Sequence, residues 1–307
     1  MSKVITIGNF DGLHLGHRKL LGTLTQEAAK RGLPSLVITY NNHPAEILFH
    51  PSQPMLLSTT ETKLQGIKDL GIDEVDLISF DAVFSRTSAE DFLMNYLIPK
   101  HSPSLIVVGF DSHFGYQRQG NYEFLKAHSQ ACGYDLIYVE PELYEGVPIS
   151  SSLIRAKLRS GEVEIAARLL GRPYTLSGNV VHSKGLGTKL GFPTANLNPV
   201  SSHILIPASG IYLSQISLRD YSAFGLTNIG TSPTVKQDGK TEIETYILDF
   251  NEDVYEQVMT VSLLRRIRDE KKFSGLEELM AAMRQDLDIA RNLIGSQQCT
   301  QHTVLSC

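Results

Sequence analysis

The chain has 307 residues, of which 42% are hydrophobic and 20% charged, and its formal net charge is -5 with a pI near 6.1. This length is sufficient for two domains with separate cores, and this composition excludes a largely disordered chain. The acidic balance argues against broad electrostatic binding to nucleic acid, although a local basic pocket for a phosphate ligand is compatible with it. We therefore expect small-molecule partners and no nucleic-acid partner.

No apolar run is long enough to span a bilayer, and the N-terminus lacks the charged and apolar regions of a signal peptide. We therefore expect a cytoplasmic protein with no membrane partner. The sequence carries no signal for or against self-association.

A glycine-rich turn follows an apolar run at 4–7 and precedes a stretch of helical periodicity. Its sequence is Gly8-Asn9-Phe10-Asp11-Gly12-Leu13-His14-Leu15-Gly16-His17. Glycines let the backbone approach a ligand closely, and the free amides of a helix N-terminus attract anions. His14 and His17 are three residues apart, so both imidazoles lie on one side of the first helical turn. The pattern predicts a phosphate-binding turn.

Two other interpretations of His14 and His17 stay open at this point. They could be surface histidines at an ordinary helix start, because short motifs carry a false-positive risk. A zinc pair is less compatible with the spacing, since two ligands on one helix face are better placed four residues apart and no further ligands lie nearby. A nucleotide site also explains the three glycines at the end of a first strand.

Strands and helices alternate through the rest of the first half. After a helix ended by Gly32, the pattern predicts, in chain order, a strand at 36–40, a helix at 61–70, a strand at 75–80, a helix at 89–97, a strand at 105–108, a helix at 122–131 and a strand at 136–139. This order predicts an α/β domain with a mostly parallel sheet and helices on both faces. The ligand should lie at the carboxyl ends of the strands.

Two later clusters fall on the same predicted edge. A glycine-rich loop with an acid and an arginine runs from Gly109 to Asn121. A helix start carries three hydroxyls, Ser150, Ser151 and Ser152, with Arg155 one turn inside. Capping explains one serine, and the remaining groups make a second anion site.

The pattern changes near residue 172. A helix at 162–170 is followed by β-rich segments at 175–181, 210–217, 223–229 and 242–250 and by one helix at 276–290. Short strands at this spacing predict a small antiparallel barrel with a packed helix.

Two segments of this half carry polar chemistry. Thr194 and Asn196 follow Gly191-Phe192-Pro193 and lie two residues apart in an extended segment, so both project from one face and could bind Mg²⁺ and phosphate oxygens. Glu242, Glu244 and Tyr246 alternate onto one face as well, where a glutamate beside a bound hydroxyl could act as a general base. A polar turn without function is the more common origin of the Thr194 and Asn196 pattern when that segment is taken alone.

The first half resembles the FMN adenylyltransferase half of bacterial bifunctional riboflavin kinase/FAD synthetases. The match rests on the histidine-glycine turn, His43-Pro44, Gly109-x-Asp111, Phe114-Gly115-x-x-Arg118-x-Gly120 and Ser150-Ser151-Ser152-x-Ile154-Arg155. The resemblance implies that His14 and His17 stabilise the α-phosphate of ATP and that the serine-arginine segment holds pyrophosphate. It further implies a nucleotide site with Gly8, Asn9, Phe10, Asp11, Gly16 and Asp111, and a flavin side shaped by His43, Pro44, Phe114, Arg118 and Asn121.

The second half is similar to the riboflavin kinase half of the same family. The match rests on Gly191-Phe192-Pro193-Thr194-Ala195-Asn196, Asn228-Ile229-Gly230, Glu244-x-x-x-x-Asp249-Phe250 and Arg268-Asp269-Glu270-Lys271-Lys272-Phe273. By this resemblance Gly191, Thr194 and Asn196 bind Mg-ATP, Glu244 activates the ribityl hydroxyl and Arg268 lies near the flavin.

The chain departs from the family pattern mainly at one loop. Ser183, Leu186 and Thr188 replace the usual Gly, Arg and Arg, and Tyr246 stands where His is frequent. Lys184 and Lys189 could supply the missing charge.

The resemblance implies a Rossmann-like nucleotidyltransferase domain at 1–172, a riboflavin kinase barrel with a C-terminal helix at 173–291 and a flexible tail at 292–307. It implies an enzyme that phosphorylates riboflavin to FMN and adenylylates FMN to FAD, with ATP as co-substrate and Mg²⁺. Two alternatives stay open: an FAD synthetase with a weak or inactive kinase half, and a flavin-binding regulatory protein.

Overall fold

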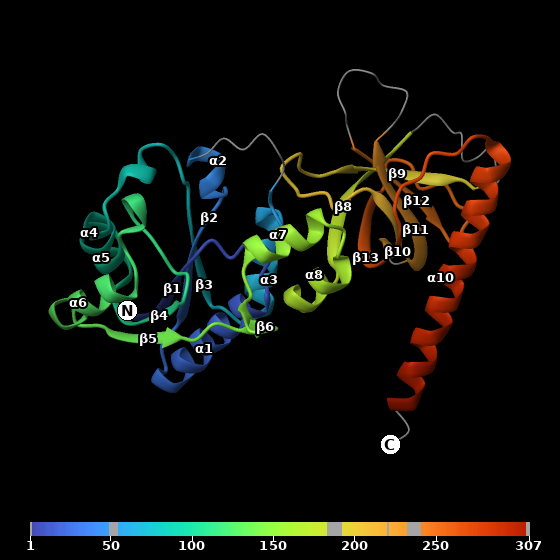
Figure 1. Ribbon diagram of the computed structural model, residues 1–307. Helices are drawn as coiled ribbons and strands as arrows, with labels where there is room; N and C mark the ends of the chain where they lie inside the picture. Colours follow the sequence, from blue (N-terminus) through green and yellow to red (C-terminus); the bar gives the residue numbers. More distant parts are fainter. Residues whose placement is uncertain (1, 49–54, 183–191, 220, 232–240, 305–307) are drawn as a thin grey trace. The chain divides into compact units, whose positions relative to one another are not determined.

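A computed structural model describes residues 2–48, 55–182, 192–219, 221–231 and 241–304. The chain divides into two compact units (Figure 1). Unit 1 contains Met1–Ile154, Leu169–Gly171 and His203–Leu205. Unit 2 contains Arg155–Arg168, Arg172–Ser202 and Ile206–Cys307.

Unit 1 is built on a five-stranded parallel sheet with the strand order β3-β2-β1-β4-β5. Its strands are β1 (Lys3–Ile7), β2 (Ser35–Tyr40), β3 (Glu74–Ile78), β4 (Pro103–Gly109) and β5 (Asp135–Val139). The chain order reverses between β1 and β4, which is where sheets of this type bind ligands. The predicted parallel sheet is confirmed.

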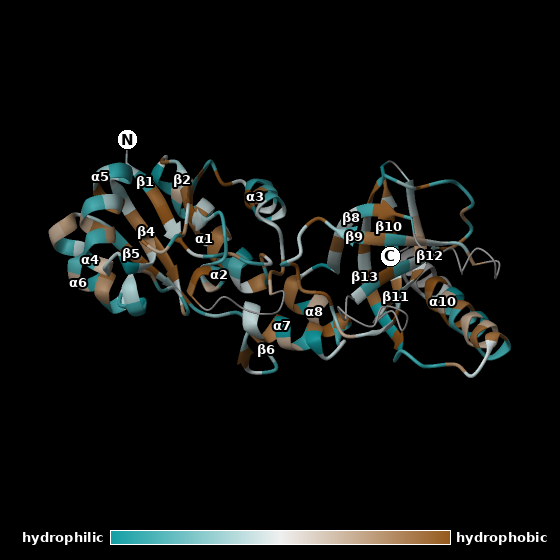
Figure 2. Ribbon diagram, turned by 90° about the horizontal axis from the view of Figure 1, so that it is seen from above, coloured by the Kyte–Doolittle hydropathy of each residue, from teal (hydrophilic) through white to brown (hydrophobic). Residues whose placement is uncertain are grey.

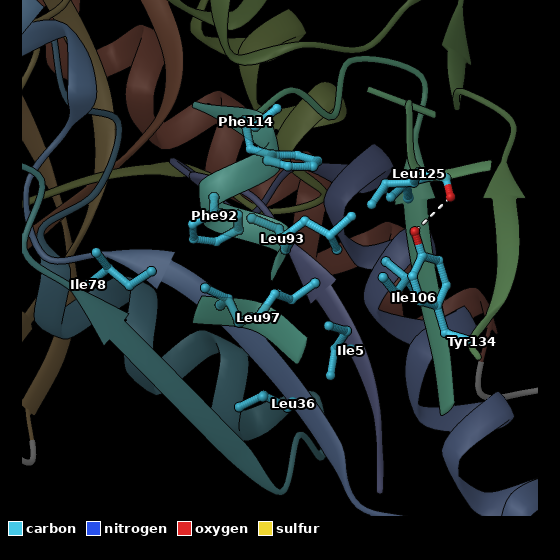
Figure 3. Packing of buried hydrophobic residues seen from close by; sticks show 14 of the residues in the cluster. Ile5, Leu36, Ile78, Phe92, Leu93, Leu97, Ile106, Phe114, Leu125 and Tyr134 are labelled. Carbon is cyan, nitrogen blue, oxygen red and sulfur yellow. Dashed lines mark hydrogen bonds between the residues drawn. The ribbon is translucent and has the colours of Figure 1, made fainter. Parts of the chain in front are cut away.

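Helices cover both faces of this sheet because its strands are apolar on both sides. Val4 and Val37 pack in one cluster with α1 (Leu15–Arg31) and α3 (Thr60–Asp69). The alternate residues of the same strands face a second cluster, which Figure 3 shows around Ile5, Phe92 and Leu125. That cluster is covered by α4 (Ala89–Asp91), η2 (Phe92–Leu97), α5 (Ile98–His101) and α6 (Tyr122–Cys132). The period of two thus fixes which helix lies on which face.

The remaining elements that precede the barrel strands in the chain are short. They are α2 (Pro44–Leu48), η1 (Phe84–Arg86), η3 (Tyr116–Arg118), the hairpin β6 (Leu143–Tyr144) and β7 (Val147–Pro148), α7 (Ser151–Arg159) and α8 (Val163–Leu170). Gly32 ends α1 in the left-handed conformation at φ 61°, as its position predicts. The helix predicted at 89–97 continues to His101 and contains a π-helical turn at Phe92–Leu97.

Unit 2 is built on a closed barrel with the strand order β10-β11-β12-β9-β8-β13, and all neighbouring strands are antiparallel. Its strands are β8 (Tyr174–Val181), β9 (Thr194–Pro199), β10 (Gly210–Leu218), β11 (Tyr221–Thr231), β12 (Thr241–Ile247) and β13 (Val258–Arg268). The predicted antiparallel barrel is confirmed. Gly178 is required in β8, because a Cβ there would lie 2.0 Å from the carbonyl oxygen of Asn198.

The prediction omitted β13, although Met259, Val261 and Leu263 alternate as buried residues along it. Leu264 and the arginines that follow interrupt that alternation. The strand predicted at 242–250 ends earlier, at Ile247, because Asp249 adopts a positive φ of 54° that no strand can contain.

Helix α10 (Leu276–Val304) differs from the prediction, which ended the helix at 290 and placed a tail at 292–307. Residues 292–304 are helical, so the helix is longer than predicted, while the flexibility expected of 292–307 stays a prediction. Leu293 and Ile294 continue the apolar stripe that packs on Leu213 and Leu226 of the barrel, and no proline interrupts the helix beyond them.

In Figure 2, strands β1 and β4 are coloured mainly as hydrophobic, whereas α10 carries both hydrophobic and hydrophilic residues. Within the described ranges, no helix has the length and apolar character needed to cross a membrane.

Candidate functional site

The turn between β1 and α1 has an unusual backbone. Phe10, Gly12 and Leu13 adopt positive φ values of 54°, 81° and 44°. A Cβ at Gly8 would lie 2.9 Å from the Phe10 ring, so the aromatic side chain occupies the space that this glycine leaves. Such strain at non-glycine residues is found mainly at functional sites, where surrounding structure holds it.

The two histidines of this turn lie face to face. The rings of His14 and His17 are stacked, with their centroids 3.6 Å apart and their planes 16° from parallel. The Nδ1 atom of His14 accepts a hydrogen bond of 3.2 Å from the His17 backbone amide and so caps α1. Among the described residues, the enclosed Nδ1 atom of His17 has no hydrogen-bond partner. The predicted placement of both imidazoles on one side of the helix start is confirmed.

Electrostatics keep the His17 imidazole uncharged. Its pKa lies well below the ordinary histidine value because burial disfavours the charged form, and because His14 and Lys63 add positive charge nearby. A neutral imidazole has one N–H group and one acceptor nitrogen. His17 is therefore suited to donate a hydrogen bond to a phosphate oxygen without being a cation.

The start of α7 lies beside the start of α1. A Cβ at Gly16 would be 3.5 Å from the carbonyl oxygen of Ile149, and Ser151 Oγ donates a hydrogen bond of 3.0 Å to the carbonyl oxygen of Asp11. Ser150 Oγ accepts from the Leu153 amide at 3.3 Å, as a helix cap does. Two helix N-termini are thus neighbours, and this arrangement favours an anion such as a phosphate chain.

The other two residues of the serine-arginine segment lie further along α7. Ser152 is exposed, and Arg155 is buried with 8% of its surface exposed. Arg155 belongs to unit 2.

Asp11 and Asn9 have structural partners. The buried Asp11 carboxylate accepts hydrogen bonds from the amides of Leu57 at 3.0 Å and Ser58 at 3.1 Å. The Asn9 carbonyl oxygen accepts from Thr39 Oγ1 and from Lys63 Nζ, both at 3.2 Å. These contacts shape the turn, and the nucleotide roles of Asn9 and Asp11 stay predictions.

The predicted flavin residues occupy different environments. Phe114 is buried in the core cluster and Asn121 caps α6 by accepting from the Phe124 amide at 2.9 Å. Arg118 is exposed beside His113, at 3.0 Å from its Nδ1 atom.

His43 and Pro44 mark the start of α2, which follows β2. Asp111 follows β4, and loss of water around its carboxylate raises the pKa of that group. Both segments therefore lie at the carboxyl edge of the sheet, and their ligand roles stay predictions.

A polar row crosses the outer face of the barrel. Asn196 of β9 pairs with Glu244 of β12, and Glu244 pairs with Asn228 of β11. Directly opposite residues of antiparallel strands have side chains on the same face, so these three side chains are neighbours. Thr194 and Tyr246 form the adjacent pair on that face. The alternation of buried Ile243 and Thr245 with Glu244 and Tyr246 confirms the predicted common face.

Glu244 is the acid at the centre of this row. Burial raises the pKa of its carboxyl group, and the like charge of Glu242 adds to the effect. Across the described parts of the chain, the Glu244 carboxylate has no hydrogen-bond partner, so it can accept a proton from a ligand. The Thr194 hydroxyl and the Asn196 carboxamide beside it are oxygen donors of the kind that Mg²⁺ prefers. Gly191, which was predicted to belong to this site, lies outside the described residues.

Arg268 is the last residue of β13 and is held by α10. Its guanidinium makes two hydrogen bonds, of 2.8 and 2.7 Å, to the buried carboxylate of Asp286. The Phe273 ring lies below it, with the centroid 5.7 Å away. The guanidinium thus fastens α10 to β13, and its predicted place near a flavin stays a prediction.

The structure brings to these sites two polar residues to which the sequence prediction assigned no role. Lys63 of α3 reaches the first turn across 54 positions of sequence, and only tertiary structure could reveal that contact. Asn228 faces Glu244, and among the described residues its buried Oδ1 atom has no partner. The strand register would have been the signal for Asn228.

Comparisons with known proteins divide the chain in the same two parts. The family model described as FAD synthetase matches residues 1–153, and the one described as riboflavin kinase matches residues 170–294. The chain is 35% identical to the "Bifunctional riboflavin kinase/FMN adenylyltransferase" of Escherichia coli strain K12, over 95% of this chain and 93% of that protein. The Listeria monocytogenes protein of the same name is 34% identical, over 93% and 90%.

One solved structure matches nearly the whole chain. It is a crystal structure from Streptococcus pneumoniae described as a macrolide-efflux protein, with a TM-score of 0.86 and 32% identity over 95% of this chain and 94% of that one.

Proposed function

The chain belongs to the bifunctional riboflavin kinase/FMN adenylyltransferase family, and on this premise we propose that it makes FMN in the barrel and FAD at the parallel sheet. ATP is the co-substrate of both reactions. The observation that carries the proposal is the presence of two separate polar sites of different construction. One has stacked imidazoles at a helix N-terminus and the other has a glutamate between two asparagines.

At the parallel sheet, an oxygen of the FMN phosphate attacks the α-phosphorus of ATP. The bond from that phosphorus to the bridging oxygen of the β-phosphate breaks, and pyrophosphate leaves. His14, His17 and the first amides of α1 donate hydrogen bonds to the α-phosphate oxygens as their charge increases. Ser150, Ser152 and Arg155 hold the leaving pyrophosphate. The nucleophile is already an anion, so this step needs no general base.

In the barrel, the terminal ribityl hydroxyl of riboflavin attacks the γ-phosphorus of ATP, and ADP leaves. Glu244 accepts the hydroxyl proton. Its carboxylate has no hydrogen-bond partner among the described residues and is therefore available for this role. Thr194 and Asn196 bind Mg-ATP through oxygen atoms. When bound, Mg²⁺ neutralises charge on the phosphate oxygens.

The alternative of a weak kinase half rests on Ser183, Leu186 and Thr188. These residues lie outside the described parts of the chain. The retained Glu244, Thr194 and Asn196 favour an active kinase. They also argue against a regulatory protein that only binds flavin, because binding alone requires no base.

One experiment tests both activities. The purified protein is incubated with Mg-ATP and either riboflavin or FMN, and FMN, FAD, ADP and pyrophosphate are separated by chromatography. We expect FMN with ADP from riboflavin, and FAD with pyrophosphate from FMN. FAD formation from FMN without FMN formation from riboflavin would show an inactive kinase half. No turnover of either flavin would support the alternative of a regulatory protein that only binds flavin.

A matched reaction with EDTA tests the metal. We expect FMN formation to stop and to return when Mg²⁺ is added in excess. Phosphorylation that continues without free Mg²⁺ would contradict the role given to Thr194 and Asn196.

A further inference from the structure

The histidine-glycine turn packs against a second segment, residues 57–66. This segment lies between β2 and β3 in the chain and includes the start of α3. The Asp11 carboxylate accepts from two backbone amides of this segment, and the Gly12 amide donates to Ser58 Oγ at 3.1 Å. A Cβ at Gly66 would lie 2.5 Å from Leu13 Cδ1, so α3 packs directly on the turn. The strained backbone of the turn is therefore held from α3 as well as from β1.

Lys63 is the buried charged residue of this segment. Its side chain is buried, with 6% of the residue exposed, and its Nζ atom donates to the carbonyl oxygens of Tyr40 at 2.7 Å and Asn9 at 3.2 Å. Tyr40 ends β2 and Asn9 follows β1. The ammonium thus joins the carboxyl ends of two neighbouring strands at the edge where the nucleotide is expected.

A buried ammonium is costly unless its surroundings compensate for it. Burial lowers the pKa of Lys63 to about 8, and the nearby Asp11 carboxylate opposes this shift. Around neutral pH the side chain is therefore mainly charged. Its charge is one of the causes that lower the pKa of His17, together with burial and His14.

We propose that Lys63 is a positioning residue for adenylyl transfer, because it fixes the Asn9 and Tyr40 carbonyls and thereby sets where the His17 imidazole meets the α-phosphate. This inference rests on the proposed adenylyltransferase function. Lys63 acts through the turn and needs no contact with substrate. Its second effect is electrostatic, since a fixed cation in the neighbourhood of His17 adds to the effect of burial in keeping that imidazole neutral as the pH falls.

Among the described residues, the charged groups that lower the pKa of His17 are His14, stacked on it, and Lys63 from α3, while Asp11 acts on Lys63. Removing the lysine charge removes one of the causes that disfavour imidazolium. The pKa of His17 should then rise, which distinguishes Lys63 from a residue that serves only folding.

The test compares Lys63→Met with wild type and with Lys68→Met, an exposed lysine of the same helix. For Lys63→Met we expect kcat for FAD formation to fall about ten- to hundredfold, as for other small misplacements of reacting groups. The acid limb of the pH profile should move to higher pH. Lys68→Met should match wild type, and riboflavin phosphorylation should be unchanged in all three proteins.

Two further measurements keep the proposal open to refutation. Ring-proton NMR of His17 should show a raised pKa in Lys63→Met, and Lys63→Arg, which retains the charge, should keep the wild-type acid limb. An unchanged acid limb and unchanged His17 titration in Lys63→Met would overturn the proposal, even if kcat fell. If Lys63→Met does not fold, Lys63→Gln takes its place under the same criterion.

The two proposals fail in different ways. Wild-type protein that forms no FAD from FMN would overturn the adenylyltransferase function and, with it, the role of Lys63 in catalysis. Wild-type protein that forms FAD while Lys63→Met behaves like Lys68→Met would overturn the role of Lys63 alone.

Discussion

The candidate phosphate sites of the two units are built from different structural elements. In the parallel-sheet unit, backbone amides at the starts of α1 and α7 are neighbours, and a strained glycine turn holds two stacked imidazoles. In the barrel unit, the candidate site consists of side chains from three neighbouring strands. The first site depends on the backbone conformation of the turn between β1 and α1. The second site depends on the pairing register of strands β9, β12 and β11.

This difference has consequences for mutation. A side-chain substitution at the first site leaves the backbone amides in place, so part of the transition-state stabilisation survives. A substitution in the barrel row removes the reactive group itself, and no backbone group can replace a general base. We therefore expect the largest single effect in the barrel.

Glu244→Gln tests the barrel site. The amide has the shape of the carboxylate but cannot accept the ribityl proton, so FMN formation should fall by about 10²–10⁴. FAD formation from FMN should be unchanged in the same preparation. Retained FMN formation would remove Glu244 from the role of base, and loss of both activities would contradict independent sites.

His17→Ala tests the helix-start site. Loss of one donor to the α-phosphate should lower FAD formation about 10²–10³-fold, while the amides of α1 maintain the remainder. Riboflavin phosphorylation is the internal control. A fall in riboflavin phosphorylation of equal size would mean that the two sites are not separate.

The buried Lys63 predicts a pH dependence of stability in the parallel-sheet unit. Its pKa is lowered from 10.5 to about 8, so between these values the unfolded chain binds more protons than the folded one. The free energy of unfolding should therefore rise with pH across this window, by about 3 kcal/mol in total. Urea unfolding of wild type and Lys63→Met at pH 8, 9 and 10 should show this rise in wild type only. If the free energy of unfolding has the same pH dependence in wild type and in Lys63→Met, Lys63 is not buried as a charged group.

The Arg268–Asp286 pair predicts how firmly α10 is attached to the barrel. Asp286→Asn leaves a half-buried guanidinium without its counter-charge and should destabilise unit 2 by about 2 kcal/mol. Asp269→Asn is a matched control, because its carboxylate is 85% exposed and pairs with Arg266 only at the surface. Equal melting temperatures for the two variants would contradict the attachment.

Asn121→Ala separates a cap from a ligand contact. Loss of the cap on α6 should lower stability by about 1 kcal/mol, and Asn121→Asp should restore it. A raised KM for FMN with unchanged stability would instead support the flavin role that the family resemblance implies.

Local patterns in the sequence predicted most elements of both units. Strands buried on both sides, such as β2 and β4, are recognised because burial on two faces produces continuous apolar runs, here at 36–38 and 105–108. Gly32 marked the end of α1 for an equally local reason. The extension of α10 was not predictable in the same way, since Leu293 and Ile294 gain their partners only when the barrel has folded.

The sequence predicted some features of the two candidate sites but not others. The pairing of His14 with His17 follows from helical spacing, and the common face of Glu244 and Tyr246 follows from strand alternation. The predicted ligand residue Asn121 also caps a helix, and the carboxylate of Asp11 also accepts hydrogen bonds from two amides, so their ligand roles stay predictions. A sequence motif specifies residue types but cannot show whether a polar group is already bound within the fold.

The sequence by itself determined the class of each unit, the order of its strands along the chain and the chemical groups available for phosphate transfer, because these depend on periodicity and composition. Only the tertiary structure decided that Lys63 lies under the first turn and that Asn228 lies beside Glu244. Both contacts join residues far apart along the chain, and their geometry is set by helix packing in one case and strand register in the other.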